Sequence, residues 1–533
     1  MQNLTHLSRV CRIKVYNDKR TAMPSARERD SLHQLLDEIE LFIKSLRHPV
    51  VVEDEVELFD LSASEWRLTV EFGKLIFAAW NAARSVSRRV EDIAYRDAER
   101  LGLFARKAAG RETITLEFRE AHHVRQPTDK APARESFQKQ LLALLSRQYP
   151  GWSLERVSHR SDREHSFSAW YTRGVARQGR TAWAFLGLGE SESPAAVDAA
   201  LAFGLIWLDW LRSRSDRVTY PGLKLIFPPQ TAETSAHRAA YLNHRAVQVE
   251  ILEWSVKEER PSVIDWRDYG NVETRLAPRR LAADLVERHR GLLSRLLGDL
   301  LAQVDVVADP AAAALSIRVL GLEVARIEGL LAPRITFGLP GNARRLGEGN
   351  HAELRQLLET ALRIRCAASP NSSSDLCRLQ SERWLESMVV RDVTKLDPAL
   401  LPTCIYPQVP AFSGMDRGVI DILLATRSGR LAVLELKVQE DINLPLQGLD
   451  YWLRVKWLQE RGQFQEFGYF PGIELAESAP LVYLVSPAFR FHSTTGRMLR
   501  YLDPAIRIIQ VGINDGWRED IKILFRREHE VGA

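Results

Sequence analysis

The chain contains little cysteine and no long hydrophobic run, and each absence excludes a class of protein. Only four cysteines occur among 533 residues, and no two lie close together. This argues against a disulfide framework and against a zinc site built on paired cysteines. No stretch reaches the roughly 18 uninterrupted apolar residues of a membrane-spanning helix, and the first residues contain no apolar signal segment. We therefore expect a cytoplasmic protein with no membrane partner.

Several common catalytic motifs are also missing. The glycine-rich segment GLGESES, at 187–193, lacks the lysine and the spacing of a phosphate-binding P-loop. There is no G-x-S-x-G motif, which would indicate a serine hydrolase, and His122-His123 has no metalloprotease spacing. The net charge of +4 permits a polyanionic partner without requiring one. Composition alone therefore does not decide the function.

A chain of this length is too long for a single core, so about two to four domains are expected. Apolar spacing predicts helices at 31–46 and over 68–95, and a polar segment at 369–375 is typical of a linker. The expected parts are a flexible tail (1–30), a small α+β N-terminal domain (31–125), an α/β module (135–260), a middle region of helices and strands (278–368) and a C-terminal domain (376–533).

The most strand-like stretch, 418–438, contains two carboxylates and an ammonium group among apolar residues. Its polar centre, Arg427-Ser428-Gly429, fits a three-residue hairpin loop with the glycine in the left-handed conformation. In that register Asp421 stands across from Glu435, and Lys437 shares their face because strand side chains alternate. The opposite face is expected to be apolar and to consist of Ile420, Ile422, Leu434, Leu436 and Val438.

Two carboxylates close together in an apolar sheet repel each other unless a positive charge lies between them. A divalent cation is one such charge, and Mg²⁺ usually takes only one or two protein carboxylates, with carbonyl, water and phosphate oxygens completing its shell. Beside it, Lys437 could orient or deprotonate an attacking water, or balance charge on the phosphate. The pattern is typical of phosphodiester hydrolysis.

These residues resemble the PD-(D/E)XK nucleases, whose core is a helix, three strands, a helix and a strand. Asp421 and Glu435-Leu436-Lys437 match the family's aspartate on the second strand and E-x-K on the third, although Ile420 replaces the proline of the consensus. The sequence Gly418-Val419-Ile420-Asp421 is similar to the G-x-x-D of the RecB-like branch. The next helix opens with Gln447 and Tyr451, which match its Q-x-x-x-Y.

The resemblance covers about 376–515. The same segment also resembles the C-terminal nuclease domain of archaeal mismatch endonucleases. It implies a metal site formed by Asp421, Glu435 and the main-chain carbonyl of Leu436. Lys437 would act on the nucleophile. Gln447 would support catalysis, and Tyr451 would face the DNA.

The resemblance also has implications for the leading helix and for the cofactors. The segment SERWLESM offers Glu382 and Glu386, one turn apart, and either fits the metal-associated glutamate that the family commonly places there. The implied cofactor is Mg²⁺, with Mn²⁺ as a substitute. An iron-sulfur cluster is not expected, because related clusters take their last three cysteines after the Q-x-x-x-Y helix and no cysteine follows Cys404.

By this resemblance we expect a metal-dependent deoxyribonuclease of prokaryotic DNA repair or anti-phage defence. Its partner would be DNA, and protein partners in a repair or defence complex and a homo-oligomer are left open. Two alternatives remain: a non-catalytic nucleic-acid-binding scaffold with a nuclease-like fold, and a nuclease that cleaves RNA.

The element order of the C-terminal domain recurs at 135–260. We therefore expect a multidomain α/β protein with a restriction-endonuclease-like αβββαβ core at its C-terminus and a degenerate second copy of that core upstream; an unrelated α/β domain is the alternative. Aligning Gly179 with Gly429 leaves no reactive residue upstream. The residues then placed at Asp421, Glu435, Lys437, Gln447 and Tyr451 are Tyr171, Phe185, Gly187, Val197 and Leu201.

Overall fold

The computed structural model divides the chain into two compact units, Met1–His123 and Val124–Ala533. The expected linker at 369–375 and the first 25 residues of the expected tail lie outside the described residues. The structure describes residues 26–46, 49–53, 56–61, 65–71, 74–80, 85–97, 100–107, 113–120, 130–162, 164–214, 217–267, 274, 276, 278–309, 313–329, 333–339, 343–347, 349–366, 376, 379–413 and 416–529.

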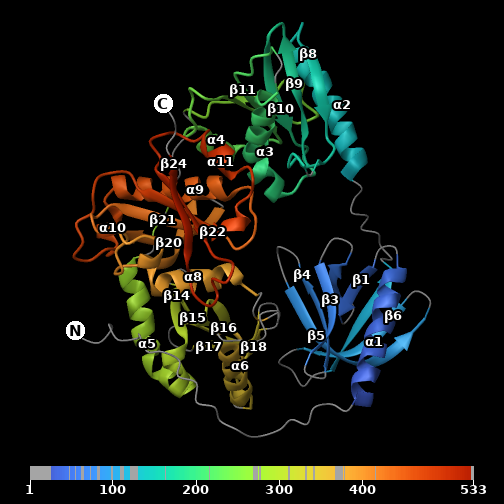
Figure 1. Cartoon of the computed structure of the whole chain (residues 1–533), viewed down its shortest axis with the longest axis vertical. Coiled ribbons are helices and arrows are strands. Elements are labelled where there is room, and N and C mark those ends of the chain that lie inside the picture. The colour runs from blue at the N-terminus through green and yellow to red at the C-terminus, as the bar shows by residue number, and fades with distance from the viewer. Residues whose placement is uncertain are drawn as a thin grey trace. The chain divides into compact units, whose positions relative to one another are not determined.

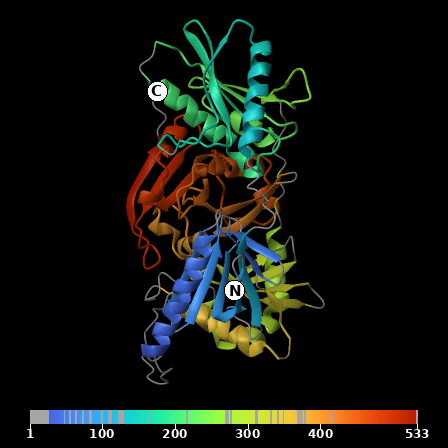
Figure 2. The same ribbon diagram turned by 90° about the vertical axis from the view of Figure 1, so that its right-hand side faces the viewer.

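The first unit is an antiparallel half-barrel covered by one helix. Helix α1 (Ala26–Ser45) begins inside the expected tail and packs its apolar side, including Ile39 and Phe42, against one face of the sheet (Figure 2). The sheet order is β2-β1-β7-β6-β5-β4-β3. The strands are β1 (Pro49–Glu53), β2 (Val56–Asp60), β3 (Glu65–Glu71), β4 (Lys74–Trp80), β5 (Ser85–Arg96), β6 (Arg100–Lys107) and β7 (Thr113–Glu120).

The helix expected over 68–95 is wrong, because this segment forms parts of β3 and β5 and the whole of β4. In β4, Leu75 and Phe77 are both fully buried, at the alternating spacing of a strand. In β5, Val90 and Ile93 face the same core although they are three positions apart. The register of β5 shifts between Val90 and Asp92 and again after Ile93. Because of these irregularities, apolar residues three positions apart face the same side of the strand, a spacing that is also typical of a helix.

The second unit begins with an α/β module at 130–264, called the upstream module. Helix α2 covers one face of its six-stranded sheet and α3 covers the other. The sheet order is β13-β12-β11-β10-β9-β8, and Figure 1 labels four of these neighbours, β11, β10, β9 and β8. The elements are α2 (Lys130–Gln148), β8 (Ser153–Ser158), β9 (Thr172–Gln178), β10 (Thr181–Gly187), α3 (Pro194–Arg212), β11 (Gly222–Phe227), α4 (Glu233–Ala239), β12 (Gln248–Glu253) and β13 (Ser262–Ile264).

The last part of the chain, 381–529, is called the C-terminal module and has the same plan. Helix α8 covers one face of its sheet and α9 the other. The sheet order is β19-β20-β21-β22-β23-β24. The elements are α8 (Ser381–Arg391), β19 (Tyr406–Ser413), β20 (Asp416–Ala425), β21 (Leu431–Leu436), α9 (Leu444–Glu460), α10 (Gln463–Glu466), β22 (Leu481–Pro487), α11 (Thr495–Leu499), β23 (Ile508–Ile513) and β24 (Ile523–His529).

The two modules have identical sheet topology. In each sheet, the first three strands pair antiparallel, the next two pairings are parallel, and the last is antiparallel. Each module places a helix before its first strand, a long helix between the third and fourth, and a short helix between the fourth and fifth. The expected mixed α/β, multidomain architecture is therefore confirmed.

A middle region between the modules contains a five-stranded antiparallel sheet, β14-β15-β16-β17-β18. Arg365, which is fully buried, donates hydrogen bonds to the carbonyls of Leu320 and Leu379 and thereby connects this region to the chain that leads into α8. The elements are α5 (Arg279–Leu297), β14 (Asp305–Asp309), β15 (Ala314–Val319), β16 (Leu322–Glu328), β17 (Arg334–Phe337), β18 (Arg344–Arg345) and α6 (His351–Ile364).

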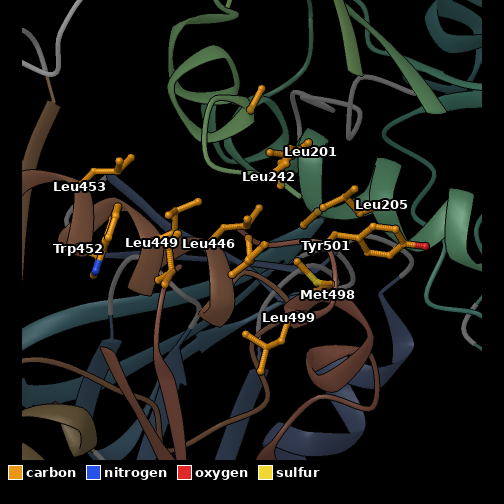
Figure 3. Packing of buried hydrophobic residues seen from close by; sticks show 14 of the residues in the cluster. Leu201, Leu205, Leu242, Leu446, Leu449, Trp452, Leu453, Met498, Leu499 and Tyr501 are labelled. Atoms are coloured by element: carbon orange, nitrogen blue, oxygen red, sulfur yellow. The ribbon is translucent and has the colours of Figure 1, made fainter. Parts of the chain in front are cut away.

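The two modules share one hydrophobic core, which α3 and α9 enter from opposite sides (Figure 3). Among the described residues, only α3 has the length and apolar composition of a membrane-crossing helix, which is weak evidence since most of it is buried in this core. The residues labelled in Figure 3 come from both modules: Leu201, Leu205, Leu242, Leu446, Leu449, Trp452, Leu453, Met498, Leu499 and Tyr501.

Corresponding segments of the two modules meet in a reciprocal pair of hydrogen bonds. The N–H of Asn243 donates to the carbonyl of Tyr501 at 2.8 Å, and the N–H of Asp503 donates to the carbonyl of Tyr241 at 2.9 Å. The two donors, Asn243 and Asp503, each follow the short helix of their own module. The two acceptors, Tyr241 and Tyr501, lie two residues before the donor of the same module. An exchange of this kind is the signature of a local two-fold relation.

Candidate active site

The hairpin of β20 and β21 has the register that its turn predicts. Ile422 pairs with Leu434. The loop is closed by Thr426, whose N–H donates to the carbonyl of Arg430 at 2.8 Å. Gly429 has a φ of +77°, the left-handed conformation expected for it. Turn chemistry therefore fixes which residues of the two strands stand opposite each other.

Replacing Gly429 with alanine should weaken this hairpin. An added Cβ would lie 2.1 Å from the carbonyl oxygen of Glu474, a backbone atom, in addition to the strain of the positive φ. We expect the free energy of unfolding to fall by about 2 kcal/mol or more, measured by urea denaturation. Gly472 is the matched control, since its φ is +74° but nothing lies within 4 Å of an added Cβ. An equal loss in both variants would show that the close approach to Glu474 has no effect.

The strand ladder stops at the Ile422–Leu434 pair, and the side chain of Asp421 occupies the next position. Its Oδ2 accepts a hydrogen bond from the N–H of Leu436 at 3.0 Å. This bond brings the Asp421 carboxylate to the Glu435–Lys437 segment, as the sequence predicted.

The predicted face of Ile420 is wrong. Ile420 belongs to the same buried cluster as Leu423, whereas Ile422 belongs to the cluster on the α8 side. The neighbouring strand β19 is irregular at the same level, because Gln408 has a φ of +55° and the pairing with β20 skips Gln408 and Asp421. The alternation of β20 is therefore interrupted at Asp421.

Glu435 and Lys437 form an ion pair inside the sheet. The Nζ of Lys437 donates to Oε1 of Glu435 at 2.8 Å, and Glu435 is only 1% exposed. The other carboxylate oxygen, Oε2, is buried and has no hydrogen-bond partner among the described residues. A buried carboxylate oxygen without a partner is costly in a folded protein, so this atom is a candidate ligand position.

Helix α8 brings a third carboxylate to the site. Glu386 is 6% exposed, and its Oε2 accepts a hydrogen bond from Nη1 of Arg383 at 2.8 Å. The same Nη1 lies 3.8 Å from Oδ1 of Asp421, so the Arg383 guanidinium connects the two acids. Gln408 also donates to Oε2 of Glu386 through its Nε2. Sequence reasoning missed Arg383 and Gln408.

The pKa directions show that the acids act on one another. Burial raises the pKa of Glu435 well above its usual range, and the charge of Asp421 raises it further. Burial also raises the pKa of Glu386 to about 8, with Arg383 opposing and Asp421 adding to the shift. For Lys437, burial would lower the pKa, but the charges of Glu435 and Glu382 outweigh it and raise the pKa.

Glu382 lies close enough to the site to be affected by it. Burial raises its pKa, the charge of Lys437 lowers it, and Asp421 raises it again. Both leading-helix glutamates therefore act electrostatically on the same centre. Glu386 shares a cation with Asp421, because Arg383 donates a hydrogen bond to Glu386 and forms an ion pair with Asp421.

Helix α9 contributes the two residues of the Q-x-x-x-Y match. Burial raises the pKa of the Tyr451 hydroxyl, and the charges of Glu435 and Asp421 raise it further, which places this phenol beside the acidic pair. Gln447, one turn earlier on the same face, has a buried Oε1 with no hydrogen-bond partner among the described residues. Two buried acceptor atoms without partners, Oε2 of Glu435 and Oε1 of Gln447, thus occur among the predicted site residues.

A pocket of about 230 Å³ adjoins the site on the side of the middle region. Arg383 lines it together with Arg318 of β15 and Gln380. Arg318 interacts electrostatically with Glu386 and is desolvated, which lowers its pKa. The middle region therefore adds a second guanidinium group next to the acids.

The residues present fit a hard divalent cation. No group of three or more histidine, cysteine, aspartate or glutamate side chains in the described ranges is placed to hold a metal ion. A cation here would have Asp421, the free oxygen of Glu435 and the carbonyl of Leu436, with water or substrate completing its shell. Magnesium accepts such a shell, since it keeps several waters and needs only one or two carboxylates.

The long helix of each module is fixed to its sheet by a glycine. A Cβ added at Gly204 of α3 would approach side-chain atoms of Leu223 to 2.6 Å and of Leu225 to 3.0 Å. One added at Gly448 of α9 would approach side-chain atoms of Leu484 to 2.7 Å and of Val482 to 3.0 Å. Each glycine thus contacts two residues, two positions apart, on the fourth strand of its sheet. Leu223 and Leu225 of β11 therefore correspond to Val482 and Leu484 of β22, and the two glycines correspond to each other.

This correspondence corrects the alignment made on the hairpin glycines. Leu225 pairs with Leu186, and Leu484 pairs with Glu435, so Leu186 occupies the position of Glu435. Phe185 instead packs on the α2 face. The upstream hairpin pairs Gln178 with Thr181 across two residues, one fewer than in the C-terminal hairpin, so aligning the turns displaces the strands.

The corrected correspondence still leaves no reactive residue in the upstream module. Leu186 pairs with Arg173, so an arginine replaces Asp421. Counting from the aligned strands and glycines, the residues at the positions of Asp421, Glu435, Lys437, Gln447 and Tyr451 are Arg173, Leu186, Leu188, Phe203 and Trp207.

Comparison with known proteins adds no family assignment. Neither a protein-family model nor a curated protein matches the sequence of this chain. The chemistry of the site is therefore inferred from its own residues.

Proposed function

We propose that the chain is a metal-dependent nuclease that hydrolyses DNA phosphodiester bonds in its C-terminal module. In this proposal Asp421, Glu435 and the Leu436 carbonyl hold Mg²⁺ or Mn²⁺, and Lys437 acts on the attacking water. The C-terminal module is then a PD-(D/E)XK nuclease domain of the RecB-like type, and the upstream module is a degenerate copy of it. A cytoplasmic role in prokaryotic repair or anti-phage defence follows from the resemblance alone.

The observation that supports this most directly is the buried, unpartnered Oε2 of Glu435 beside Asp421. A purely structural carboxylate would have its hydrogen-bonding capacity satisfied. This one accepts a hydrogen bond from an ammonium on one oxygen, while the other oxygen is buried without a donor and the carboxylate interacts with a second acid, Asp421. A cation would stabilise this arrangement.

The groups around the cation position can have different roles in hydrolysis. A bound divalent ion would supply a more acidic water and neutralise charge on the phosphate. The ammonium of Lys437 can orient that water through the hydrogen-bonding capacity left beyond Glu435. Arg383 and Arg318 can attract the neighbouring phosphates of the strand, because both lie at the edge of the adjoining pocket.

The direct test is cleavage of plasmid, linear duplex and single-stranded DNA, and of RNA, with Mg²⁺ or Mn²⁺ and with EDTA. We expect metal-dependent cutting of DNA that disappears in Asp421→Asn, a change that keeps the acceptor for the Leu436 N–H while removing the charge. Cutting of RNA alone would favour the RNA-cleaving alternative. Binding without any cutting would favour a scaffold and contradict the proposal.

A further inference from the structure

We infer that this chain cuts only one strand of a DNA duplex in each binding event, leaving a nick. This rests on the proposed nuclease activity and on one further feature of the fold. The catalytic module is paired, inside the same chain, with a module of the same topology that has no catalytic residues.

The pairing has the symmetry of a dimer. The reciprocal bonds between the corresponding Tyr241–Asn243 and Tyr501–Asp503 segments form an antiparallel bridge with a local two-fold axis, and the short helix of each module packs on the long helix of the other. Polar contacts cross the interface in both directions. Arg238 of α4 binds Asp450 of α9. Arg497 of α11 lies 3.4 Å from Asp209 of α3.

Two-fold pairing matters because the two backbones of a duplex are themselves related by two-fold axes. A protein with two equivalent sites related by a two-fold axis can contact both strands in one complex, as two-fold DNA-binding proteins contact both halves of a palindromic site. In this chain, only one of the two positions has Asp421, Glu435 and Lys437. On this inference, the other strand would lie at the corresponding position of the upstream module.

That position cannot hold a cation. Arg173, which replaces Asp421, is only 7% exposed and is fixed by a hydrogen bond from Nη1 to the carbonyl of Arg160 at 2.9 Å. Its guanidinium also lies 4.4 Å from the ring centre of Phe167. A fixed positive charge repels a metal ion, and Leu186 and Leu188 offer no ligand in place of Glu435 and Lys437.

A second copy of the chain cannot place its own C-terminal module where the upstream module now lies without breaking the shared core. The face of the C-terminal module formed by α9 and α11 is already buried against the upstream module in one continuous core (Figure 3). For a catalytic module of another chain to take that place, this core would have to open. Leu446, Leu449 and Leu499, all fully buried there, would become exposed.

The test is a time course on supercoiled plasmid, in molar excess over the full-length protein, with Mg²⁺. We expect open-circular DNA to form first, with linear DNA absent while most of the plasmid is still supercoiled. A duplex oligonucleotide labelled with a different dye on each strand should lose one label or the other, and not both, in a single turnover. Asp421→Asn is the control and should leave the plasmid supercoiled.

Each other outcome has a definite meaning. Linear DNA that appears together with open circles from the first time point would overturn the inference and leave the nuclease proposal intact. Cutting confined to single-stranded DNA or RNA would also overturn it while supporting a nuclease. No cutting of any nucleic acid would overturn the proposed function, and the nicking inference with it.

Discussion

Replacing Glu435 with glutamine is expected to abolish cleavage without a large loss of stability in the metal-free fold. Burial and the charge of Asp421 both disfavour the ionised carboxylate, so removing its charge relieves a cost that Lys437 only partly offsets. Glutamine keeps an oxygen that can accept from the Lys437 ammonium. Cleavage should fall by at least about 10²–10³-fold, the loss typical when one group that stabilises a charged transition state is removed.

Thermal unfolding with and without Mg²⁺ or Ca²⁺ tests whether Glu435 binds the metal ion and how its replacement changes stability. A cation that binds only the folded protein at a hundred times its dissociation constant should add about 2.7 kcal/mol of stability. Glu435→Gln should lose most of this gain. Glu440→Gln is the control, because Glu440 is exposed and only five residues away. A glutamine variant that cleaves at the native rate, or that unfolds several kcal/mol more easily without metal, would contradict a ligand role for Glu435.

The hairpin could be predicted from the sequence because its determinants are local. A three-residue loop with glycine at its last position allows few registers, and the register alone brings Asp421 level with Glu435. Alternation then places Lys437 beside Glu435, as the ion pair between them confirms. The same local logic predicted the order of helices and strands in both modules.

Other parts of the site could not be predicted, because they depend on contacts between distant segments. Gln408 reaches Glu386 from an irregular point of β19, and a single sequence contains no signal for this contact. Arg383 is the exception, because it lies three residues before Glu386 on α8 and helical spacing could have predicted this ion pair. The alignment of the two modules failed for a related reason. Turn length differs between the hairpins, so only the packing of Gly204 and Gly448 against their sheets reveals the corresponding residues.

Replacing Arg238 with methionine should have the largest effect on stability. Arg238 is 1% exposed, and its Nη2 lies 2.7 Å from both Asp198 of its own module and Asp450 of the other. Burial would lower its pKa, but the two carboxylates outweigh that effect and raise it. Methionine fills much of the volume but leaves two acids facing each other. The free energy of unfolding should fall by about 3–5 kcal/mol, the usual cost of removing one partner from a buried ion pair.

The two-fold arrangement provides the control on the other side of the same interface. Arg497 also crosses between modules, to Asp209, but its side chain is 40% exposed. Arg497→Met should therefore cost less than about 1 kcal/mol in urea denaturation. Adding Asp450→Asn to Arg238→Met should recover part of the loss, because it removes an unpaired charge. If both arginine variants lost the same stability, burial of Arg238 would not be what joins the modules. If Arg238→Met lost far more, the pairing would be a permanent part of the fold, and the C-terminal module would remain bound to the upstream module.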